Sequence, residues 1–85
     1  MSNYLAHMNK LGGSTAFARR KEYLDYNFKP YLSQLNSNSR VLEVGPGIGE
    51  MISLLNDHNI AKIDLIDNDA EVLKYCQAKY KISKT

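Results

Sequence analysis

The sequence has no tryptophan, only two prolines and a single cysteine, Cys76, among its 85 residues. A lone cysteine has no partner within the chain, so an internal disulfide is excluded and a reducing, cytoplasmic compartment is expected. Long apolar runs are also lacking: no stretch approaches the roughly 20 residues that cross a bilayer, and the first residues do not resemble a signal peptide. We therefore expect a soluble chain with no membrane partner.

An excess of charge of either sign is lacking as well. The chain has 11 lysines and arginines against 9 acidic residues, a formal net charge of +2. No basic cluster is dense enough to follow a phosphate backbone, so no nucleic-acid partner is expected. His7 has no cysteine or aspartate cluster at ligand spacing, and His58 is expected to interact with the last carbonyls of its helix, so no metal site is predicted.

Helical spacing of apolar side chains dominates the N-terminal part of the chain. Over residues 3–11 the spacing predicts a first helix, which Gly12 and Gly13 are expected to end. Ser14 or Thr15 then provides a hydroxyl that can cap the next helix.

The second helical pattern contains a proline. Apolar residues recur seven, four, four and three positions apart, at Phe17, Leu24, Phe28, Leu32 and Leu35. Because Pro30 lacks an amide and disfavours helix at the residue before it, we predict two pieces, 16–28 and 30–36. The basic run Arg19-Arg20-Lys21 is expected to be a solvated helix face, with Lys21 paired to Asp25. Residues 1–39 thus form a predicted N-terminal helical segment, ending in the turn-rich "NSNS".

Residues 40–85 change to an alternation of strands and helices. We predict a strand over 40–44, a helix over 50–58 stopped by a left-handed asparagine, a strand over about 62–66, and a last helix capped by Asp69. This order is typical of the opening of a parallel α/β sheet with a right-handed crossover, a first β-α-β-α unit. The last helix is expected to place Val72, Leu73, Cys76 and Tyr80 inward.

Between the first predicted strand and its helix lie three alternating glycines, Gly45, Gly47 and Gly49, within "VGPGIGE". In open parallel sheets, ligands bind at the carboxyl ends of strands, where glycines permit a sharp turn and a close approach to the backbone. Pro46 stiffens the loop and removes one donor. On its own, the pattern fits a strand-to-helix turn without a ligand equally well.

The second predicted strand ends in "LIDND", which places Asp67 eighteen residues after Gly49. A carboxylate at the tip of a neighbouring strand can accept hydrogen bonds from both vicinal hydroxyls of a ribose. The alternative is an aspartate that caps a turn or helix, although Asp69 is already placed for that task. Loop and acid together favour a nucleoside-type ligand.

The segments "VLEVGPGIGE" and "IDLIDNDAEVL" resemble the first two signature segments of the class I, Rossmann-like S-adenosylmethionine-dependent methyltransferases. The discriminating feature is an acidic residue followed by Gly-x-Gly-x-Gly, in place of the Gly-x-Gly-x-x-Gly of dinucleotide enzymes. The resemblance implies that Glu43 and the loop from Gly45 to Gly49 hold the methionine end of S-adenosyl-L-methionine. It also implies that Asp67 binds the ribose hydroxyls and that Asn68 and Asp69 follow along the ribose and adenine edge. Pro46 departs from the small residue or cysteine often found there.

Under this resemblance the chain covers only part of the family's fold. The family has a seven-stranded sheet, and the two predicted strands would be its first two. We therefore expect a fragment of a longer methyltransferase, or a sheet completed by a second copy through its open edges. A small-molecule or sugar methyl acceptor is expected, and no catalytic residue is identified.

Two alternatives to methyl transfer remain open from the sequence. One is a non-catalytic nucleoside-binding or assembly module. The other is a fragment of an NAD(P)-dependent oxidoreductase, which the spacing of the glycines disfavours.

Overall fold

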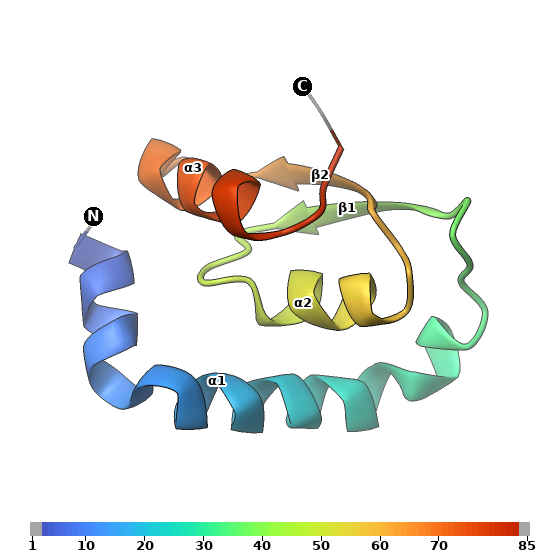
Figure 1. The fold of residues 1–85 in the computed structure, drawn as a ribbon, viewed down its shortest axis with the longest axis horizontal. Coiled ribbons are helices and arrows are strands. Elements are labelled where there is room, and N and C mark those ends of the chain that lie inside the picture. Colours follow the sequence, from blue (N-terminus) through green and yellow to red (C-terminus); the bar gives the residue numbers. More distant parts are fainter. Residues whose placement is uncertain (1–2, 84–85) are drawn as a thin grey trace.

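The computed structural model describes residues 3–83, with side chains from Thr15 onward. The chain runs in the order α1 (Asn3–Leu32), β1 (Arg40–Val44), α2 (Glu50–Asp57), β2 (Lys62–Ile66) and α3 (Ala70–Lys79) (Figure 1). The two strands pair in parallel, with Val41 opposite Ile63 and Glu43 opposite Leu65. Across the described residues the protein is thus a small mixed α/β domain of three helices and a two-stranded parallel sheet.

Both predicted strands are confirmed with their bounds. The helix α2 ends one residue earlier than expected, at Asp57, and His58 is its C-cap. Asn59 has the predicted left-handed backbone, with φ of 62°. Asp69 caps α3 as predicted, since its side chain accepts a hydrogen bond from the amide of Glu71.

The predicted breaks in the N-terminal helices are wrong, because α1 is one helix of 30 residues. Gly12 and Gly13 lie inside it, and neither Ser14 nor Thr15 is a cap. A glycine weakens a helix by only about 1 kcal/mol relative to alanine, so it does not by itself end one. The ribbon does change direction within the blue part of α1 (Figure 1).

Pro30 also lies inside α1, in its last turn. The hydrogen-bond pattern resumes directly after it, since the amide of Ser33 donates to the carbonyl of Lys29 at 3.1 Å. Leu32 is buried in the core and fixes this turn against the rest of the domain. Tertiary packing therefore outweighs the local preference of the residue before proline.

The core lies between α2, the sheet and the facing sides of α1 and α3. In Figure 1, α2 lies between α1 and the sheet. The buried apolar side chains are Leu32, Ile48, Ile52, Leu54, Leu55, Ile60, Ile63, Val72 and Cys76. The predicted inward positions of α3 are confirmed for Val72 and Cys76, which are buried, and Tyr80 packs against the core from the helix end.

The opposite face of the sheet is not covered by any described residue. Leu42, Val44 and Ile66 point to this face, and each is more than half exposed. At one end of the face, the guanidinium of Arg40 pairs with Asp64 at 3.3 Å. Parallel sheets are almost always covered on both faces, so this open apolar face is unusual.

Candidate functional site

The loop between β1 and α2 has a backbone that favours glycine at three positions. Gly45, Gly47 and Gly49 have φ values of 62°, 59° and 94°. Residues with a side chain rarely adopt such angles, because Cβ then crowds the following carbonyl oxygen. The loop begins at the carboxyl edge of the sheet, where the amide of Gly45 donates to the carbonyl of Ile66 at 2.8 Å.

The three glycines have different surroundings. A Cβ on Gly45 would meet nothing within 4 Å, so this glycine opens onto free space. A Cβ on Gly49 would lie 2.1 Å from the ring of Tyr80. The Tyr80 hydroxyl, in turn, donates to the carbonyl of Ile48 at 2.6 Å. Gly49 therefore makes room for α3 to close over the loop, whereas Gly45 faces a hollow.

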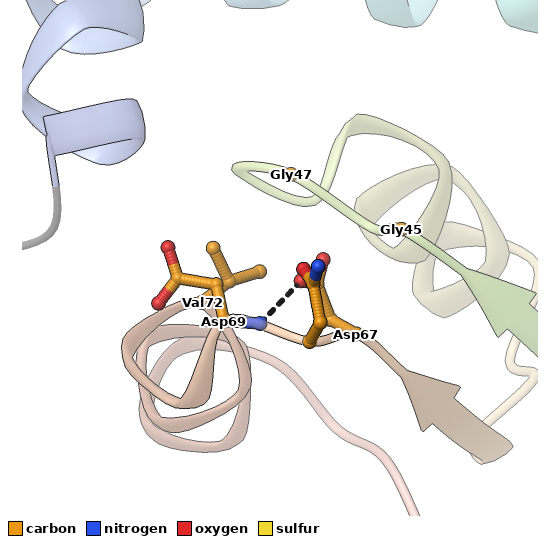
Figure 2. Close-up of a pocket in the computed structure, with 6 residues that line it drawn as sticks. Gly45, Gly47, Asp67, Asp69 and Val72 are labelled. Carbon is orange, nitrogen blue, oxygen red and sulfur yellow. Dashed lines mark hydrogen bonds between the residues drawn. The ribbon is translucent and has the colours of Figure 1, made fainter.

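The first hollow has a volume of about 310 Å³ and lies at the carboxyl ends of both strands. The residues that line it are Gly45, Gly47, Asp67, Asn68, Asp69 and Val72. Figure 2 shows the side chain of Asp67 pointing toward the glycine loop. The structure thus brings together the two glycines and the acidic tip of the neighbouring strand, which are far apart in the sequence.

Asp67 has one oxygen engaged and one available. Its Oδ1 accepts a hydrogen bond from the amide of Asp69 at 2.8 Å, the dashed line in Figure 2. This short turn fixes the orientation of the carboxylate. Within residues 15–83, no hydrogen bond to its Oδ2 is present. A carboxylate oxygen accepts more than one hydrogen bond, so Asp67 keeps the capacity to accept from two hydroxyl groups.

A second hollow, of about 590 Å³, lies between α1 and the glycine loop. Its apolar wall consists of Tyr23, Leu24, Phe28, Pro46 and Met51. Its charged side consists of Arg20, Glu43 and Glu50. Gly45 and Gly47 line both hollows, so the two cavities adjoin along the bare backbone of the loop.

The charged side of the second hollow combines one guanidinium with two carboxyl groups. The Nε of Arg20 donates to Glu50 at the start of α2, where the positive end of the helix dipole also favours a carboxylate. The Nη2 of Arg20 is shielded from solvent and has no hydrogen-bond partner among the described residues. Burial raises the pKa of the Glu43 carboxyl above its ordinary value. Both features indicate groups whose charge is incompletely compensated.

Arg20 is the site residue that the sequence analysis missed. The prediction of a solvated basic face is wrong for it, and Lys21 pairs with Asp57 of α2 at 2.5 Å in place of the expected Asp25. A signal was present, because Arg20 precedes Leu24 and Phe28 at intervals of four, which places all three on one side of the helix.

Cys76 and Tyr80 support the loop from α3. The Cys76 side chain is buried, and its Sγ lies 3.5 Å from the carbonyl of Gly47. Burial, with smaller contributions from nearby carboxylates, raises the pKa of the Cys76 thiol to about 11. The group therefore remains a thiol at neutral pH and acts as a small core side chain, not as a nucleophile.

Of the predicted site residues, Asp67 and Asn68 line the first hollow, and Glu43 and Pro46 line the second. Gly49 lies under Tyr80 and lines neither hollow. Among the residues described, no group of three side chains is arranged to hold a metal ion, and no helix is long and apolar enough to cross a membrane. The side chain of His7 lies outside the described part.

Comparison with known proteins gives no match: no protein-family model, curated protein or solved structure is significantly similar to this chain. The two adjoining hollows are therefore the features of this chain that indicate a ligand. Their size together is within the range of small-molecule sites, and each of them contains polar side chains.

Proposed function

We propose that this chain binds S-adenosyl-L-methionine and provides the methionine- and ribose-binding half of the cofactor site of a Rossmann-like methyltransferase. In this proposal, β1 and β2 are the first two strands of a larger parallel sheet in a cytoplasmic enzyme. The observation that carries the proposal is the junction of the two hollows at Gly45 and Gly47. One elongated ligand can lie across this junction with different chemistry at each end.

At the first hollow the groups suit a ribose. Asp67 presents a carboxylate held by its own turn, and Asn68 adds an amide beside it. Vicinal hydroxyls can donate to the two oxygens of such a carboxylate. The open space at Gly45 lets the sugar lie against the backbone, where a side chain would exclude it.

At the second hollow the groups suit the amino-acid end of the cofactor. An α-ammonium group and a sulfonium are cations, and Glu43 and Glu50 supply negative charge. The unpartnered Nη2 of Arg20 supplies a donor for the α-carboxylate. A zwitterionic, sulfonium-bearing ligand therefore compensates the groups that are left unsatisfied in the protein alone.

When bound, S-adenosyl-L-methionine supplies an activated methyl group that an acceptor attacks in line while the carbon–sulfur bond breaks onto sulfur. The contribution of this chain is to bind and orient. Asp67 fixes one end, Arg20 and Glu43 fix the other, and the rigid loop sets the distance between them. Orientation of this kind can contribute several kcal/mol to a rate enhancement.

Calorimetric titration of the 85-residue chain with S-adenosyl-L-methionine, NAD and adenosine tests the proposal. We expect S-adenosyl-L-methionine to bind most tightly, and Asp67→Ala to weaken its binding at least tenfold, which corresponds to about 1.4 kcal/mol. Asp64→Ala is the matched control, because Asp64 lies in β2, which directly precedes Asp67, but belongs to the open face of the sheet.

Three outcomes contradict the proposal in different ways. Equal weakening by the two aspartate variants would show a non-specific loss of charge. Tighter binding of NAD would favour an oxidoreductase. Equal affinity for adenosine and S-adenosyl-L-methionine would leave a nucleoside-binding module without use of the methionine end.

A further inference from the structure

The second hollow is larger than an amino-acid end requires, and its apolar wall has no assigned task. Tyr23, Leu24 and Phe28 come from α1, and Pro46 and Met51 come from the loop and α2. Of the charged groups, Glu43 and Glu50 flank the glycine loop in the sequence, and Arg20 reaches Glu50 from α1. The cavity thus has a charged part beside the loop and an apolar part, three of whose five residues come from α1.

Two aromatic side chains of this wall are left accessible. Tyr23 is 68% exposed and Phe28 is 41% exposed. The Phe28 ring makes a tilted contact with Tyr31, with centroids 6.2 Å apart. Aromatic rings that are open to a cavity favour a flat partner, because ring pairs gain roughly 0.5–1.5 kcal/mol beyond the burial of their area.

The composition of the wall argues against a sugar in this part of the cavity. A sugar has many hydroxyl groups, each of which needs a hydrogen-bond partner once it is removed from water. Among the apolar-wall residues, Tyr23 alone has a polar side-chain group. An anionic ligand is disfavoured as well, because Glu43 and Glu50 outnumber Arg20 at the adjoining side.

We infer that the apolar part of the second hollow binds the methyl acceptor, and that the acceptor is a neutral, flat aromatic small molecule bearing a hydroxyl or amine. This inference rests on the proposed function, because the transferable methyl group would lie near Glu43, between the ribose and amino-acid ends of the cofactor. The acceptor's lone pair forms the new bond to the methyl carbon, the electron pair of the carbon–sulfur bond stays on sulfur, and the acceptor's proton passes to solvent.

The test uses 4-methylphenol as the aromatic probe and methyl α-D-glucopyranoside as the sugar probe. Each is titrated into the ¹⁵N-labelled 85-residue chain, with and without S-adenosylhomocysteine, and the amide shifts are followed by NMR. We expect 4-methylphenol to produce saturable shifts centred on Tyr23, Phe28 and Met51, and the sugar to produce none.

Variants of α1 locate the binding. Tyr23→Ala and Phe28→Ala are each expected to weaken binding of 4-methylphenol at least fivefold. Tyr26→Ala, on the same helix but 83% exposed and not part of the wall, is the control and should leave it unchanged. Circular dichroism checks that the helix content is retained in all three.

The outcomes separate this inference from the proposed function. Binding of S-adenosylhomocysteine without any shift from 4-methylphenol overturns the acceptor assignment alone. Binding of 4-methylphenol at the wall without binding of S-adenosylhomocysteine supports an aromatic site and contradicts methyl transfer. Stronger shifts from the sugar, or equal effects of the Tyr23 and Tyr26 variants, overturn the inference.

Discussion

The contrast between Gly45 and Gly49 gives a quantitative test of how the loop is built. Both have positive φ, so alanine at either position is strained by roughly 1–2 kcal/mol. Alanine also lowers the conformational entropy of the unfolded chain, which offsets about 0.4–1 kcal/mol of this strain. At Gly45 nothing else opposes the methyl group, since no atom lies within 4 Å of its position. The expected loss of stability for Gly45→Ala is therefore about 1 kcal/mol.

At Gly49 the methyl group also collides with Tyr80. The position of Cβ is 2.1 Å from Cε2 of the ring, which therefore has to move. Moving the ring breaks its hydrogen bond to Ile48, a loss of roughly 0.5–1.5 kcal/mol. It also reduces the packing of the half-buried Tyr80 ring. Removing a fully buried aromatic side chain costs about 3–5 kcal/mol, so this partial loss of packing is expected to cost about 1–2 kcal/mol. Gly49→Ala is therefore expected to destabilise the fold by about 3–4 kcal/mol.

Urea denaturation followed by far-UV circular dichroism measures both variants, and a double-mutant cycle isolates the collision. In a Tyr80→Ala background the ring is absent, so Gly49→Ala should cost only about 1 kcal/mol, as at Gly45. The expected coupling energy between positions 49 and 80 is about 2–3 kcal/mol. Equal losses at the two glycines, or a coupling energy near zero, would refute the assignment of Gly49 to packing under α3.

Four further predictions follow from the site and the sheet. Gly45→Val should abolish binding of S-adenosyl-L-methionine in calorimetry, while the circular dichroism spectrum stays that of the wild type; retained binding would show that the ligand does not lie over this glycine. Burial raises the pKa of Glu43, so its ionised form opposes folding, and stability should fall as pH rises through that pKa. Glu43→Gln should accordingly raise the melting temperature at pH 7. The difference in melting temperature from the wild type should vanish at pH values where Glu43 is protonated in both the folded and the unfolded state. The same variant should weaken binding of the cationic cofactor. Cys76, with a pKa raised to about 11, should react with iodoacetamide at pH 8 no faster than the protein unfolds, and fast labelling of the native chain would contradict its burial. Val44→Lys, on the open sheet face, should reduce concentration-dependent self-association in sedimentation velocity, whereas Tyr26→Lys should not.

The parts of the fold that the sequence predicted are those set by local chemistry. The strands are short β-branched runs, Asp69 offers a capping oxygen, and Asn59 tolerates a left-handed backbone. The course of α1 was mispredicted because Pro30 and the glycine pair have local costs that packing overcomes. Leu32 anchors the turn that contains Pro30, and although the apolar spacing includes Leu32, it does not show which residues Leu32 packs against.

In the candidate site, too, the residues defined by local sequence were predicted and those defined by tertiary packing were missed. Loop glycines and the aspartate after β2 are recognisable because their residue types and spacing carry the chemistry. Arg20 was missed because a run of three basic residues has the same composition whether it faces solvent or a carboxylate. Its role depends on the packing of α1 against α2, which brings Arg20 to Glu50, 30 positions away in the sequence. The requirement for glycine at position 49 likewise depends on a distant residue, because the ring of Tyr80 at the end of α3 occupies the space that a Cβ would need.

Under the proposed function, one cause would account for both the partial cofactor site and the open face of the sheet. Under the proposed function, the adenine and the catalytic groups contact strands that continue the sheet beyond β1 and β2. Those strands would bring helices onto the face where Leu42, Val44 and Ile66 are exposed, since a parallel sheet is joined by crossovers that cover it on both sides. The hollows lie at the carboxyl edge and under α1, so that covering would leave them accessible. The proposed additional strands would therefore both bury the apolar face and complete the ligand site, without displacing any residue assigned to the site.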